Sequence, residues 1–312
     1  MAIFFRNKVF TLKTEATYGT DAAPTPALNS MLALDVTLSP MEGQDVDRNL
    51  DLSYFGNTGT LVADLHMKMA FKVELEPSGT AGVAPAWGPA LMACGMAQTI
   101  VAVTSVTYNP ITDLPTSASI HFWVGNTQYR MLGARGNVKM MWDKQGIPYL
   151  EFTFTGLFNV ATEGARPTGS VFTAFKTPKT AAKRHVPTFT LGGVSALKLS
   201  ALSLDLANAV EPRLLINSEE ILITGRNPKL DMVVEAEALS LLNPFQTALD
   251  SGSMALQFIH GTVAGKRTTL NVPALQIARP TSLDNAQGVV NWPLSGMPLP
   301  VTGNDEFTLV LT

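Results

Sequence analysis

Charge is the scarcest property of this sequence. Asp, Glu, Lys and Arg together make up 15% of the 312 residues, against about 25% in an ordinary soluble domain. The formal net charge is −3, and the Lys and Arg residues form no dense cluster. Such a chain lacks the basic surface with which proteins clamp nucleic acid. With 46% hydrophobic residues, it is expected to hide much of its surface, by self-assembly or in one large core.

Cysteine and histidine are nearly absent too. Cys94 is the single cysteine, which excludes an intramolecular disulfide, and we expect it to be a buried hydrophobic residue. The four histidines show no metal-binding spacing such as HExxH. The acidic pairs Glu219–Glu220 and Glu235–Glu237 are more typical of a solvated strand face than of the two carboxylates of a glycosidase. We therefore predict no enzyme, no metal site and no cofactor.

Long apolar runs are also missing. The N-terminal sequence MAIFFRNKVFTL lacks the apolar core and cleavage site of a secretory signal, so we expect the chain to be made and kept in a cytoplasm. Residues 77–112 carry no charge, but several prolines and glycines interrupt them. A membrane-spanning helix does not tolerate such interruptions, and no membrane partner is predicted.

Alternation of polar and apolar residues is abundant. Residues 62–75 (VADLHMKMAFKVEL) and 149–155 (YLEFTFT) each place apolar side chains on one face and polar side chains on the other. Period two predicts strands with one buried and one wet face. A hairpin is predicted at residues 143–148, with Gly146 free to take a positive φ. Only two short helices are predicted, at residues 87–93 and 243–252, so the chain is expected to be mainly β.

Five landmarks recur in the same order in the two halves of the chain. LALDV matches LSLDL, FTFTGLF matches NWPLSGM, and three further segments pair as strand, helix and hairpin: residues 65–75 with 229–238, 85–95 with 244–252, and 143–148 with 282–288. An ordered set of this kind predicts a duplication. The expected division is an N-terminal arm (1–26), a first domain (27–161), a linker rich in Thr, Ala, Pro and Lys (162–187) and a second domain (188–312).

Several stretches together resemble a known family. They are KTEATYGTDAAPTPAL with LDVTLSP, the loop EGQDVDRNLDLSYFGNTGT, GVAPAWGPALMACGM followed by VTYNP, and LGARGNVKMMWDKQGIPYLEFTFTGLF. In this order the chain resembles the major tail tube proteins of long-tailed bacteriophages, well over residues 13–158 and more loosely over 197–312. The resemblance implies two tandem tail-tube β-sandwich domains, each with one short flanking helix, whose strands contribute to an inter-subunit β-barrel.

The resemblance also implies partners and a location. The chain would be a structural virion protein of the tail, assembled in the host cytoplasm, that forms stacked rings around the path of DNA ejection. A duplicated domain favours a homotrimeric, pseudo-hexameric ring, with a homohexamer as the alternative. A tape measure protein, a tail tip and a tail terminator are implied partners, and DNA would pass without sequence-specific binding. Another β-rich tail component (terminator, hub or decoration protein) and an unrelated soluble β-sandwich binding module remain alternatives.

Two sets of residues are candidates for function. DNA must slide through a tube without adhering to it, and each lysine–phosphate contact adds affinity, so the wet faces of the two alternating strands are candidates to line the lumen. These lumen candidates are Asp64, His66, Lys68, Lys72, Glu74, Lys229, Asp231, Glu235 and Glu237. An ordinary solvated outer face is the alternative interpretation.

The second set lies in the long, acidic loop predicted at residues 39–60 and in its counterpart at residues 207–225. Exposed aromatic side chains beside an arginine suit an interface anchor, so this loop is a candidate for ring stacking, with a mobile surface loop as the alternative. The stacking candidates are Glu42, Asp45, Asp47, Arg48, Asp51, Tyr54, Phe55, Arg213, Glu219 and Glu220. The N-terminal arm at residues 14–26 is predicted to be extended and able to reach a neighbouring copy, with a flexible terminus as the alternative.

Overall fold

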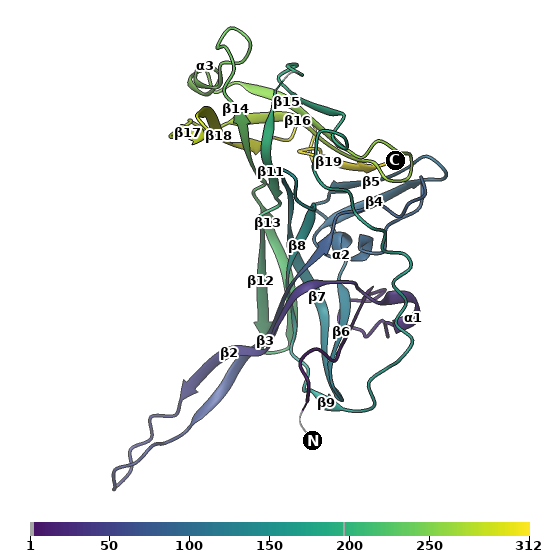
Figure 1. Ribbon diagram of the computed structural model, residues 1–312. Coiled ribbons are helices and arrows are strands. Elements are labelled where there is room, and N and C mark those ends of the chain that lie inside the picture. The colour runs from purple at the N-terminus through teal and green to yellow at the C-terminus, as the bar shows by residue number, and fades with distance from the viewer. Residues whose placement is uncertain (1–2, 196) are drawn as a thin grey trace.

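A computed structural model describes residues 3–195 and 197–312 of the chain (Figure 1). Strands account for 50% of it, in a large antiparallel arrangement with three short helices in the described residues. The prediction of a mainly β chain is therefore confirmed.

The elements of the described residues are distributed over the whole chain. The helices are α1 (Pro26–Asn29), α2 (Gly88–Met92) and α3 (Pro244–Leu249). The strands of the first half are β1 (Lys8–Thr14), β2 (Leu34–Asp47), β3 (Thr60–Glu74), β4 (Met96–Val101), β5 (Ser105–Pro110), β6 (Ala118–Val124), β7 (Thr127–Asp143), β8 (Tyr149–Leu157) and β9 (Thr162–Glu163). Those of the second half are β10 (Thr188–Leu191), β11 (Leu199–Asp205), β12 (Asn208–Leu215), β13 (Ser218–Arg226), β14 (Lys229–Glu235), β15 (Ser253–His260), β16 (Thr268–Ile277), β17 (Asp284–Ala286), β18 (Val289–Pro298) and β19 (Thr308–Leu311).

One antiparallel layer runs through both halves of the chain. Its pairings give the order β2–β3–β8–β7–β11–β14–β18–β17, which is eight strands within the described residues. The central pairing joins the halves, because residues 139–143 of β7 lie opposite residues 201–205 of β11. We call this layer the main sheet.

A second layer covers the apolar side of the main sheet. Over the first half its order is β1–β6–β7–β9, and over the second half it is β10–β15–β16–β19–β5–β4. Strands β7 and β16 belong to both layers, since each pairs with one layer at its start and with the other further along. The β5–β19 pairing is a second place where strands of the two halves join.

Aromatic side chains fill the space between the layers. Phe71 of β3 stacks on Phe152 of β8 with ring centroids 5.1 Å apart, and Phe10 of β1 meets Phe71 edge to face at 4.8 Å. Trp142 of β7 contacts Phe258 of β15 at 5.3 Å, so the apolar core continues from one half into the other. The alternation at residues 67–75 is confirmed, because its odd-numbered side chains are buried.

The local predictions are largely confirmed. α2 and α3 lie inside the predicted helical segments, and the Asn243 side chain caps α3 by accepting a hydrogen bond from the Gln246 N–H. The predicted hairpin connects β7 to β8, but its positive φ belongs to Gln145 (60°) and not to Gly146. β14 ends at Glu235, earlier than the predicted strand at residues 229–238.

The N-terminal segment differs from the predicted extended arm. β1 pairs with β6 along its whole length, and Phe10 and Leu12 of β1 are buried. Beyond β1, the Glu15 carboxylate accepts hydrogen bonds from the hydroxyls of Ser117 and Ser119 and from the backbone N–H of Gly133. These contacts attach residues 8–19 to the first half of the same chain.

Candidate functional site

The exposed face of the main sheet carries paired charges. On the first half, Lys72 Nζ lies 2.9 Å from Glu151 of β8 and 3.5 Å from Asp35 of β2. The hydrogen bond to Glu151 and the two negative charges raise the pKa of the Lys72 ammonium. Of its neighbours on β3, Lys68 is exposed and Glu74 is half-buried. All three belong to the predicted lumen candidates and lie on one face of one strand.

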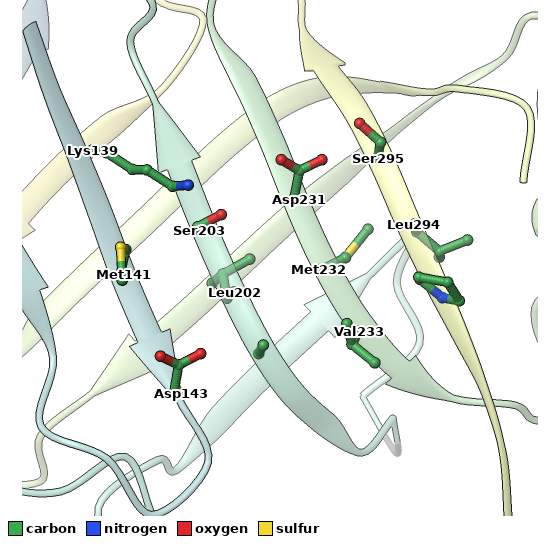
Figure 2. Close-up of a pocket in the computed structure, with 12 residues that line it drawn as sticks. Lys139, Met141, Asp143, Leu202, Ser203, Asp231, Met232, Val233, Leu294 and Ser295 are labelled. Atoms are coloured by element: carbon green, nitrogen blue, oxygen red, sulfur yellow. The ribbon is translucent and has the colours of Figure 1, made fainter. Parts of the chain in front are cut away.

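The same face continues across the junction of the halves (Figure 2). There a shallow groove of about 310 Å³ crosses four neighbouring strands. It is lined by Lys139 of β7, Ser203 of β11, Asp231 of β14 and Ser295 of β18. Asn137 lies two residues before Lys139 on β7, and its carboxamide donates a 2.7 Å hydrogen bond to Asp205 of β11. A polar contact therefore accompanies the backbone pairing between β7 and β11.

The second half repeats the pairing of charges. Lys229 Nζ lies 3.2 Å from Asp231 on β14, and Lys198 Nζ lies 2.5 Å from Glu235. A hydrogen bond to Glu235 raises the pKa of the Lys198 ammonium. Glu237 follows the end of β14, so it is not part of the row that the other candidates form.

The remaining lumen candidates lie where β3 leaves the body. Asp64 is exposed with φ 53°, and the Nδ1 atom of His66 lies 2.9 Å from its carbonyl oxygen. This bend marks the start of a hairpin that sequence reasoning described only as a loop. Sequence reasoning also left out the charged partners on neighbouring strands, namely Asp35, Lys139, Glu151 and Asp205, because their place beside β3 and β14 depends on strand order.

A long two-stranded hairpin projects from the body (Figure 1). β2 pairs with β3 as far as Asp47 opposite Thr60, so the prediction of a loop over residues 39–60 is wrong for residues 39–47, which belong to β2, and holds for residues 48–59. From here on, residues 39–66 are called the arm and residues 48–59 its tip; this arm is not the N-terminal arm of the sequence analysis. Glu42, Asp45 and Asp47 lie on β2, and Arg48, Asp51, Tyr54 and Phe55 lie in the tip.

Large apolar side chains of the arm are exposed to solvent. Phe55 is fully exposed and Tyr54 is 70% exposed, while Leu61 and Val62 on the returning strand are 62% and 57% exposed. An isolated two-stranded hairpin is at best marginally stable in water, and exposed apolar side chains that lie together mark interaction sites. The arm therefore has the composition of an interface segment.

A second hairpin, β12–β13, occupies the counterpart segment at residues 207–225 and lies against the first half. Arg135 donates to the carbonyl oxygen of Ile221 at 2.7 Å, and the backbone N–H of Ile221 donates to the hydroxyl of Tyr18. At the start of β12, Asn208 donates to the carbonyl oxygens of Cys94 and Gly136. The stacking candidates Arg213, Glu219 and Glu220 lie near the free end of this hairpin.

Both ends of the main sheet are open in the described part of the chain. β2 pairs only with β3, and β17 pairs only with β18. Around β17, Leu283, Val289 and Val290 are exposed. Unpaired strand edges recruit further strands, so each end of the sheet is a ready site for another chain.

No three potential metal ligands lie together among the described residues, and no helix among residues 3–195 and 197–312 is both long and apolar enough to cross a membrane.

The comparison with protein families decides the identity. Residues 6–309 match the family described as phage tail tube protein. The chain belongs to that family. No curated protein matches the sequence. The phage tail tube protein is thus a structural and non-enzymatic component of the virion tail that assembles with itself into a tube, as the resemblance had implied.

Proposed function

We propose that three copies of the chain form a closed ring of the tail tube, in which β17 of one copy pairs with β2 of the next. The observation that carries this proposal is the β7–β11 pairing, which already joins the two halves edge to edge inside one chain. The open edges at β2 and β17 are the two ends of that same sheet. Pairing them repeats between copies what the chain does internally.

Matching topology supports two tandem domains. The first half has β2–β3–β8–β7 in the main sheet and β1–β6–β7–β9 in the second layer. The second half has β11–β14–β18–β17 and β10–β15–β16–β19 in the same relations. α2 follows β3 as α3 follows β14. We therefore propose a duplicated sandwich, and β7–β11 as its internal domain junction.

Ring size follows from the strand count. Eight main-sheet strands from each of three copies give 24 strands in the described residues. With strands about 4.8 Å apart and tilted by about 40°, such a barrel is about 48 Å wide between backbones, which leaves room for duplex DNA after side chains are added. Six copies would double this width, so the geometry favours three.

In this ring the exposed face of the main sheet lines the lumen. The other face is buried in the sandwich, and lysines such as Lys72, Lys198 and Lys229 are each paired with a carboxylate on the exposed face. A lysine already held by a carboxylate is a weaker partner for phosphate, and the pairs keep the wall close to neutral. This arrangement would let DNA slide without sequence-specific binding.

A single substitution tests the ring closure. The Val290 carbonyl accepts from the backbone N–H of Ala236, which directly follows β14. In the β17–β18 hairpin the opposite residue, Asn285, therefore turns its backbone N–H toward the open edge. Asn285→Pro removes this N–H but keeps the backbone bonds between β17 and β18, because proline is tolerated at such edge positions. It also removes the side-chain oxygen that accepts from the Gly288 N–H, and the control variant below lacks this oxygen too. We expect folded monomers that form no tubes in electron micrographs.

Asn285→Thr is the matched control, since it keeps the N–H and favours the strand. It should form tubes as the wild type does. Tubes of normal length from Asn285→Pro would refute the pairing of β17 with β2, and a covalently cross-linked wild-type ring of six chains would refute the trimer.

A further inference from the structure

The two hairpins of the chain have the same place in the topology but unequal support. β12–β13 leaves the main sheet between β11 and β14, as the arm leaves it between β2 and β3. Yet β12–β13 lies against strands β7 and β8 of the other half, whereas the arm projects into solvent (Figure 1). Within one chain, therefore, β12–β13 packs against the other half, whereas most of the arm packs against no other part of the described chain.

Resting the proposal on the ring described above, we propose that the arm of one copy docks over the second half of the adjacent copy, in the way that β12–β13 docks over the first half of its own chain. In the ring, β2 of one copy follows β17 of its neighbour as β11 follows β7. The arm that begins at β2 is thereby carried to the neighbour's second half, just as β12 is carried from β11 to the first half.

Burial supports this correspondence. Ile221 is the anchor of β13, fully buried against the first half and held through its backbone by Arg135 and Tyr18. On the returning strand of the arm, by contrast, Leu61 and Val62 are more than half exposed. Burial of apolar side chains against a partner surface is favourable, so both residues would be stabilised by a contact with a second chain.

The second half offers apolar surface at the corresponding place. β12–β13 rests beside the end of α2 and over β7 and β8, and the counterparts of these elements are α3, β16 with β17, and β18. On them Leu249 is 77% exposed and Met297 is 48% exposed. Arg279 lies two residues after the end of β16, the counterpart of the strand that contains Arg135, and it is exposed. In the proposed contact it would donate to a carbonyl oxygen of the arm, as Arg135 donates to that of Ile221. The occupant we assign to this surface is the arm of a second copy.

Cysteine cross-linking tests this contact directly. Cys94 is buried, and it is the single cysteine of the chain, so Val62→Cys and Met297→Cys can be introduced without background. In tubes of the double variant under mild oxidation, we expect a covalent product of three chains on a non-reducing gel, because each arm reaches one neighbour in a closed ring. Mixing the two single variants should yield cross-linked dimers and no larger product.

A control pairs Val62→Cys with Leu114→Cys; Leu114 is more exposed than Met297 (93% against 48%) but lies in the loop after β5, and this pair should give no such product. Normal tubes without the Val62–Met297 cross-link would overturn the docking while leaving the ring intact. Failure of the wild-type protein to form any tube would instead overturn the proposed function.

A second measurement covers the case in which cysteines disturb packing. Val62→Asp places a charge in the proposed contact but leaves the monomer unaffected, because Val62 is exposed there. We expect an unchanged melting temperature of the monomer and at least a tenfold rise in the concentration needed for tube formation. Assembly at the wild-type concentration would overturn the proposal.

Discussion

Arg226 gives the sharpest test of how the two halves are held together. At the base of β13 it donates to the carbonyl oxygen of Ile111 at 3.0 Å, to Asn304 at 3.2 Å and to the Glu306 carboxylate at 2.9 Å. One guanidinium thus connects the second hairpin, the end of β5 and the loop before β19. The side chains of Arg226 and Glu306 are only 12% and 11% exposed.

The expected magnitude follows from this burial. Arg226→Leu leaves the Glu306 carboxylate buried without its cation, and its second oxygen already lacks a partner in the described residues. Breaking one side of a buried ion pair destabilises a protein by about 3–5 kcal/mol, whereas replacing both sides by apolar groups is often neutral. We therefore expect Arg226→Leu to lower the free energy of unfolding by about 3–5 kcal/mol, and Arg226→Leu with Glu306→Leu to recover most of the loss.

Denaturant unfolding of the monomer, followed by tryptophan fluorescence, measures both variants. Lys229→Leu is the control, because its ion pair with Asp231 is exposed and such pairs add little stability. The reasoning would be refuted if Arg226→Leu resembled Lys229→Leu, or if the double variant were no more stable than the single one.

Three further predictions concern separate parts of the molecule. Burial raises the pKa of the Glu76 carboxyl to about 7, against the opposing effect of Lys266. The folded state therefore holds this proton more tightly than the unfolded state does. The resulting contribution to folding stability is full below the ordinary carboxyl pKa and is lost as the pH rises through 7. Glu76→Gln should thus raise the melting temperature at pH 8 and not at pH 4. Replacing Glu74 and Glu235 by lysine should slow DNA ejection from the phage and steepen the salt dependence of DNA binding by tubes, by about 0.9 per added phosphate contact; unchanged kinetics and slope would place this face outside the lumen. Deleting the tip, residues 48–59, in favour of a two-residue turn should leave folded rings that do not stack, and long tubes from this variant would exclude the tip from stacking.

Local signals in the sequence were enough for elements whose two faces differ. β3 and β8 were predicted from period two because Phe71 and Phe152 enter the core while Lys72 and Glu151 stay wet. Both helices near the predicted segments begin with proline at the first turns, and Asn243 caps the second. Such features depend only on residues that are close together in the sequence, so they can be predicted without knowledge of the rest of the chain.

Features that depend on strand order could not be predicted. The outer part of β2 is exposed on both faces, so it has no periodicity of burial and reads as a loop. The anchoring of Glu15 by Ser117 and Gly133 joins residues about a hundred positions apart. The ion pair of Lys72 with Glu151 exists because β3 and β8 are neighbours in the sheet, which no local pattern states.

The two junctions of the proposed ring would differ in strength. Inside one chain the halves are joined twice, by β7 with β11 and by β5 with β19. The β4–β5 hairpin that makes the second join has no counterpart among the described strands of the second half, where α3 leads directly to β15. Between copies, the proposed contact therefore has the β17–β2 edge and the docked arm, but no pairing like β5–β19. A tube built this way should come apart between copies and leave each pair of halves folded, since its weaker junctions are the ones that assembly has to form.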